Sequence, residues 1–168
     1  MIMNYIAICF LLIILSCTDT RTKNTSSKFV VSPQTYKIKV CDYFGETTEG
    51  GEVKGYFYKD RIEKIEVVLY AELGKIVKEF IIDSNVSNSY EFKQKYYSYN
   101  KPFHYQDFKV LDSLTVLGTI NNGKIKIDSI IGNNVNEEYI YRISSKINSE
   151  IEIYIQFLGK CKNKGDLD

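Results

Sequence analysis

The densest group of side chains that could bind a ligand lies between residues 90 and 105. A tyrosine offers a flat apolar face and a hydroxyl group, which suits stacking against sugars, peptides or other ring-bearing ligands. The alternative is an aromatic ladder that fills a core, and adjacent Tyr96 and Tyr97 must point to opposite faces of a regular strand. The sequence leaves both interpretations open for Tyr90, Phe92, Tyr96, Tyr97, Tyr99, Phe103, His104 and Tyr105.

The sequence contains few residues that could form a catalytic or metal-binding motif. His104 is the only histidine and could act as an acid or base, but the chain has no G-x-S-x-G nucleophile motif, no P-loop and no GxGxxG. Asp83–Asn88 resembles a calcium loop superficially, yet it lacks the glycine and the bidentate glutamate that such a loop needs. We therefore predict no catalytic residue, no metal and no cofactor. A hydrolase that uses His104 remains the enzymatic alternative.

Composition excludes further classes of protein. The 168 residues carry 22 Lys plus Arg against 21 Asp plus Glu, so the net positive charge that a nucleic-acid binder needs is missing. With 44% hydrophobic and 14% aromatic residues, the chain is too rich in core-forming side chains to be disordered. We expect one folded domain, residues 29–168, and no nucleic-acid partner.

The elements of this domain are predicted to be antiparallel strands. Apolar residues alternate with polar ones, which is the pattern of a half-buried strand, and Gly50-Gly51, Asn122-Gly123 and Gly132 supply turns. We predict an all-β fold of roughly eight antiparallel strands, arranged as a meander, a sandwich or a partly open barrel. The clearest alternating runs are Tyr36-Ile38-Val40, Ile125-Ile127, Tyr139-Tyr141-Ile143 and Ile151-Ile153-Ile155-Phe157.

Residues 60–80 admit a second interpretation. Their apolar positions follow a helical spacing of three and four residues, and Asp60 with Glu63 imitates a capping box. Against a helix, the composition is rich in β-branched residues, and Gly74 with Lys75 falls where a turn between two strands would lie. We favour two strands here.

The amino terminus carries the most specific signal. Tyr5–Leu15 is an unbroken apolar run of eleven residues, which has the length of a signal-peptide core and is too short to span a membrane. The run ends in Ile14-Leu15-Ser16-Cys17, which resembles the lipobox of bacterial lipoprotein precursors. The resemblance implies removal of residues 1–16, lipid attachment to Cys17, and export to the cell envelope. A secretory signal that merely contains Cys17 is the alternative.

The remaining features follow from that assignment. Residues 17–28 have the composition of a flexible tether, and Thr18 after Cys17 is compatible with sorting to the outer membrane rather than the inner one. Cys41 and Cys161 are then the two cysteines left in an oxidising compartment, either as a disulfide or as two unrelated thiols. We expect a membrane-tethered, non-catalytic module that binds an envelope protein, a peptide or a small ligand. A structural or immunity-type lipoprotein is a further alternative.

The lipid anchor can be tested by metabolic labelling with palmitate. We expect the wild-type chain to incorporate label and the Cys17→Ser variant to lose it, because only a thiol accepts the diacylglycerol group. A wild-type protein without label would contradict the assignment.

Overall fold

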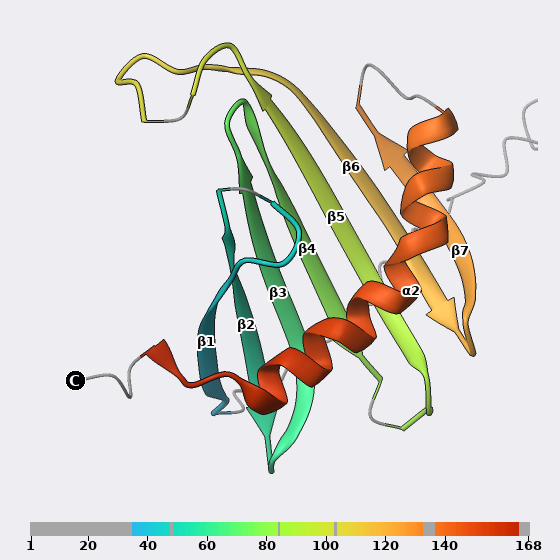
Figure 1. The fold of residues 1–168 in the computed structure, drawn as a ribbon. Helices are drawn as coiled ribbons and strands as arrows, with labels where there is room; N and C mark the ends of the chain where they lie inside the picture. Colours follow the sequence, from blue (N-terminus) through green and yellow to red (C-terminus); the bar gives the residue numbers. More distant parts are fainter. Residues whose placement is uncertain (1–34, 48, 84, 103, 133–136, 165–168) are drawn as a thin grey trace, which may run out of the picture. The chain divides into compact units, whose positions relative to one another are not determined.

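The computed structural model describes residues 35–47, 49–83, 85–102, 104–132 and 137–164. Within these ranges the chain forms seven strands followed by one long helix (Figure 1). The strands are β1 (Lys37–Tyr43), β2 (Gly51–Tyr58), β3 (Arg61–Ala71), β4 (Gly74–Ile82), β5 (Ser89–Tyr99), β6 (Val110–Asn121) and β7 (Lys124–Ile131), and the helix is α2 (Glu137–Lys160).

The predicted antiparallel fold is confirmed, as an open meander. The seven strands pair in chain order from β1 to β7, each antiparallel to the next, in a single sheet. β1 and β7 are its two edges, so the described sheet does not close into a barrel. Helix α2 runs diagonally across one face (Figure 1).

Three of the described connections are two-residue turns, and two of these have both residues at positive φ angles. Asn122 and Gly123 both have positive φ angles, 50° and 76°, as the Asn-Gly signal predicts for a hairpin. Lys59 and Asp60 adopt the same left-handed conformation, with φ angles of 48° and 63°, although their residue types give little warning of it. Sequence alone therefore located one of these turns clearly and the other poorly.

Residues 60–80 form β3 and β4 rather than a helix, which confirms the favoured interpretation. The turn between the two strands lies at Glu72 and Leu73, two positions earlier than predicted, and Gly74 is already the first residue of β4. A Cβ atom on Gly74 would lie 2.4 Å from the carbonyl oxygen of Tyr97. The glycine is therefore needed for a close approach of β4 and β5.

The two strands predicted within 139–157 are wrong, because this segment lies in helix α2. The buried positions Ile143, Ile147, Ile151, Tyr154 and Leu158 recur every three or four residues, which is the spacing of one helix face. By contrast, Tyr141 and Ile153 are 73% and 48% exposed. The run of isoleucines suggested strands, whereas the helical period was the decisive signal. Among the described residues, no helix is both long and apolar enough to span a membrane.

The core lies between α2 and the sheet. Alternate residues of each strand point toward the helix, and the middle of the sheet contributes Val53, Ile65, Val67 and Phe80, each with an exposed fraction of 0%. Tyr154 of the helix, also fully buried, packs against Phe80 with its ring centroid 6.0 Å away. All these elements belong to one compact unit, Gln34–Asp168.

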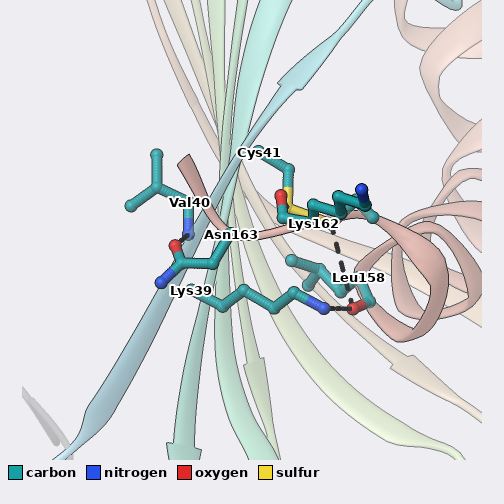
Figure 2. Close-up of a disulfide and its surroundings, with 7 residues drawn as sticks. Lys39, Val40, Cys41, Leu158, Lys162 and Asn163 are labelled. Atoms are coloured by element: carbon teal, nitrogen blue, oxygen red, sulfur yellow. Dashed lines mark hydrogen bonds between the residues drawn. A yellow bond between two sulfur atoms is a disulfide. The ribbon is translucent and has the colours of Figure 1, made fainter. Parts of the chain in front are cut away.

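The tail that follows α2 is fixed to edge strand β1. Cys161 forms a disulfide with Cys41, with Cα atoms 6.3 Å apart. Figure 2 shows that Asn163 accepts a hydrogen bond from the backbone N–H of Val40, at 3.1 Å. Lys164 forms an ion pair with Asp42 at 2.7 Å. The tail therefore covers part of an edge that would otherwise present unpaired backbone groups.

We expect the disulfide to contribute substantially to stability. The double variant Cys41→Ser/Cys161→Ser should lose about 2–5 kcal/mol of unfolding free energy, because the bridge closes a loop of some 120 residues and restricts the unfolded chain. Urea unfolding followed by circular dichroism measures the loss. Dithiothreitol should destabilise the wild type similarly and leave the double variant unchanged. Equal stability of the oxidised wild type and the double variant would contradict this role.

Candidate functional site

The predicted aromatic group does not come together as one site. Along β5, Phe92 points toward α2 and is 3% exposed, and Tyr90 and Tyr96 pack against the same core. Tyr97 lies on the opposite face, where the ammonium of Lys75 sits 5.0 Å from its ring centroid. The strand portion of the group therefore divides between the core and the uncovered face.

The remaining members lie at the end of β5 and in the loop after it. Tyr99 is 7% exposed and packs edge-on against Phe108, with ring centroids 5.2 Å apart. His104 and Tyr105 are exposed neighbours with ring centroids 4.7 Å apart. Phe103 lies outside the described residues. Of the predicted binding residues that the structure describes, only His104 and Tyr105 thus present exposed rings in this loop.

This loop belongs to a larger surface at one end of the sheet. Because successive strands are antiparallel, the β1–β2, β3–β4 and β5–β6 connections all lie at the same end (Figure 1). Two of the loops are bonded to neighbouring strands by backbone hydrogen bonds of 2.9 Å: Tyr70 of β3 donates to Gly50, and Tyr99 of β5 donates to Leu73. We call this end of the sheet, with its three loops, the rim.

Large apolar side chains gather on this rim. We call the group the loop-end patch: Phe44, Leu73, Tyr105, Phe108, Val110 and Leu111, which are between 42% and 78% exposed. Among the described residues at the opposite end of the sheet, three large apolar side chains are exposed, namely Val86 at 50%, Ile38 at 49% and Ile81 at 37%. Exposed apolar groups concentrated on one side of a domain mark an interaction surface.

A buried ion cluster between the sheet and α2 binds the β1–β2 loop of the rim. Lys78 points from β4 toward α2 and is 2% exposed. Its ammonium donates to Glu46 at 3.0 Å, to Glu150 at 2.8 Å and to the hydroxyl of Tyr154 at 2.9 Å. The Tyr154 hydroxyl in turn donates to the other carboxylate oxygen of Glu46. All three N–H bonds of the ammonium thus have protein acceptors.

The cluster keeps the Tyr154 phenol neutral. Burial raises the pKa of Tyr154 well above its ordinary value of 10, and the hydrogen bond to Glu46 raises it further. The pKa of Tyr43, whose ring packs edge-on against Tyr154, is raised by burial and then by the charges of Glu46 and Glu150. Because the folded pKa exceeds the unfolded one, the associated stability is complete below pH 10 and declines as the pH rises above it.

Glu46 connects the ion cluster to the loop-end patch. It lies in the β1–β2 loop two residues after Phe44, the most exposed member of the patch at 78%. Gly50 ends the same loop with a φ of 71°, and a Cβ atom there would lie 2.8 Å from the Phe44 ring. The loop is therefore fixed by the carboxylate of Glu46 and by the close packing of Phe44 on Gly50.

Sequence reasoning missed these residues, although a signal was present. Lys78 occupies a core-facing position between Ile76 and Phe80 in the alternating pattern of β4, and Gln94, its register partner on β5, is also buried. Polar residues at apolar positions of two strands indicate a buried polar site. Their partners Glu46 and Glu150 come from distant segments, so the spacing of residues could not identify them.

A cavity of about 430 Å³ forms the second feature that could hold a ligand. It lies at the other end of the domain, between the first half of β1, the β2–β3 turn and the end of α2. The lining is mixed, with the apolar side chains of Phe57 and Leu158 beside charged and polar groups. Its lining residues are Lys37, Ile38, Lys39, Phe57, Asp60, Leu158, Gly159 and Asn163.

We expect Lys78→Met to cost about 3–5 kcal/mol of unfolding free energy, because it leaves two partly buried carboxylates without their cation. Urea unfolding at pH 7 measures the change. Lys95→Met, on the uncovered face of neighbouring β5, is the matched control and should stay within about 0.5 kcal/mol of the wild type. Adding Glu46→Gln and Glu150→Gln to Lys78→Met should recover part of the loss. Equal effects of the two single lysine variants would contradict a stabilising cluster.

No protein-family model matches this chain, and comparison with curated proteins and with solved structures gives no significant match. Its function is therefore argued from its own residues and geometry.

Proposed function

We propose that this chain is an exported lipoprotein, anchored through Cys17, whose domain binds a partner protein through the loop-end patch. The observation that carries the proposal is the concentration of exposed Phe, Tyr, Leu and Val side chains at one end of the sheet. Aromatic and large aliphatic residues of this kind serve as anchors that fill pockets on a partner.

The direction of β1 supports this arrangement. The described residues begin at Thr35, two positions before Lys37 at the start of β1, and β1 ends at Tyr43 beside the loop-end patch. Seven residues of strand cover about 20 Å. Thr35 and the patch are thus at opposite ends of the sheet, so a chain that is anchored before Thr35 can present the patch away from the bilayer.

The ion cluster favours binding over catalysis. Within the part of the chain that the structure describes, Lys78 is the charged residue with the lowest exposed fraction, and its three N–H bonds are directed at Glu46, Glu150 and Tyr154. An ammonium whose three N–H bonds all have protein acceptors and that is 2% exposed cannot reach a substrate. We assign it the task of holding the β1–β2 loop in place.

The proposal is tested by site-specific photocrosslinking in intact cells. A photoreactive amino acid at Leu73 should capture a defined partner, whereas the same group at Val86, at the other end of the sheet, should not. Phe44→Ser/Leu111→Ser should reduce the Leu73 crosslink at least tenfold, since buried anchors each contribute about 1–2 kcal/mol or more to binding. Unchanged thermal unfolding shows that the variant is folded. Equal capture from Leu73 and Val86 would contradict the proposal.

A further inference from the structure

Basic side chains gather at the end of the domain where the tether enters. The start of β1, the β2–β3 turn and the end of α2 meet around the cavity described above. Asp60 is the acidic residue in the cavity lining. We call the surrounding positive residues the basic end: Lys37, Lys39, Lys59, Arg61, Lys160 and Lys162.

Two of these lysines stabilise the carboxyl end of helix α2. Lys39 donates to the carbonyl oxygen of Leu158 at 2.6 Å, and Lys160 lies in the last turn of α2. Both offset the partial negative charge at the carboxyl end of the helix. Lys37, Lys59, Arg61 and Lys162 are exposed and are left to contribute a positive potential at the surface.

The basic end differs from the rest of the charged surface. On the uncovered face of the sheet, part of the charge is paired, as in the ion pairs of Lys64 with Glu66 at 2.7 Å and with Glu79 at 3.2 Å. The whole chain has a formal net charge of only +1. A local excess of positive charge in a nearly neutral protein directs that end toward an anionic partner.

We propose that the basic end docks on the anionic headgroup surface of the membrane that holds the chain. This inference rests on the proposed lipid anchor, because it takes Thr35, two residues before Lys37, as the point where the tether arrives. The tether adds Arg21, Lys23 and Lys28 against Asp19. Basic residues next to a membrane anchor are attracted by anionic lipids, and the anchor raises their effective concentration at the surface.

Binding to vesicles tests the inference without the anchor. The chain from Thr18 to Asp168 lacks Cys17 and retains the compact unit Gln34–Asp168, which contains the whole sheet, the helix and the disulfide. We expect it to sediment with vesicles of phosphatidylcholine containing 30% phosphatidylglycerol, and not with phosphatidylcholine alone. Raising NaCl from 50 to 500 mM should release it, because salt screens the attraction.

Matched charge reversals locate the surface. Arg61→Glu/Lys162→Glu should weaken binding to the anionic vesicles at least tenfold. Lys109→Glu/Lys146→Glu changes the net charge equally at exposed positions outside the basic end, and should change binding less than threefold. If thermal unfolding shows that the first variant is destabilised, the neutral pair Lys37→Gln/Arg61→Gln replaces it, with at least a threefold loss expected.

Three results would overturn the inference. They are absence of wild-type binding to anionic vesicles, equal losses in the two reversal variants, and complete displacement by millimolar glycerol phosphate, which would indicate a site for a soluble anion. None of these results tests the proposed lipid anchor, because the vesicle assay uses an unlipidated chain. Failure of palmitate labelling at Cys17 would instead remove the anchor and leave the vesicle result standing.

Discussion

The buried ammonium of Lys78 is the constraint on which the arrangement of this domain depends. A charge with 2% exposure is tolerated only when its hydrogen bonds are complete, and here the three acceptors come from two separate segments. Glu46 belongs to the β1–β2 loop, whereas Glu150 and Tyr154 belong to α2. The helix therefore cannot slide or rotate on the sheet without leaving charges unpaired, and the loop cannot open without the same cost. One side chain thus couples the position of the helix to that of the loop-end patch.

The disulfide of Cys161 complements this constraint at the other end of the helix. Tyr154 and Cys161 are seven residues apart, about two helical turns, so α2 is held near the middle by the ion cluster and at its end by a covalent bond to β1. The tail beyond the helix then lies along an edge strand. The opposite edge, β7, has no such cover among the described residues, and it carries Lys124, Lys126 and Asp128. Charged side chains on an edge strand oppose pairing with another chain.

Local pattern predicted most of the sheet because each strand has one face on the core. Alternation located β1, β7 and the Asn122-Gly123 turn, and β-branched composition correctly resolved residues 60–80. The prediction was wrong at 139–157, where isoleucine on most sides of the segment imitates an alternating strand; Ile153 is exposed although Ile151 is fully buried. The ion cluster could not be predicted from the sequence, because Lys78 and Glu46 are brought together by sheet topology and not by their spacing along the chain. The sequence also could not show that Tyr105 is exposed and Phe92 is buried, because exposure to solvent depends on the folded sheet.

The loop-end patch and the basic end lie at opposite ends of the sheet, so the length of the sheet sets the distance between the two proposed surfaces. β3, β5 and β6 contain 11, 11 and 12 residues, which at about 3.4 Å each span roughly 35–40 Å. A tether by itself would let the loop-end patch sample many heights above the bilayer. Docking of the basic end would restrict the patch to one height, because the hydrogen-bonded sheet has a fixed length. The strands would then set the distance between the membrane and the partner, and the ion cluster would hold the binding loops at the far end of that spacer.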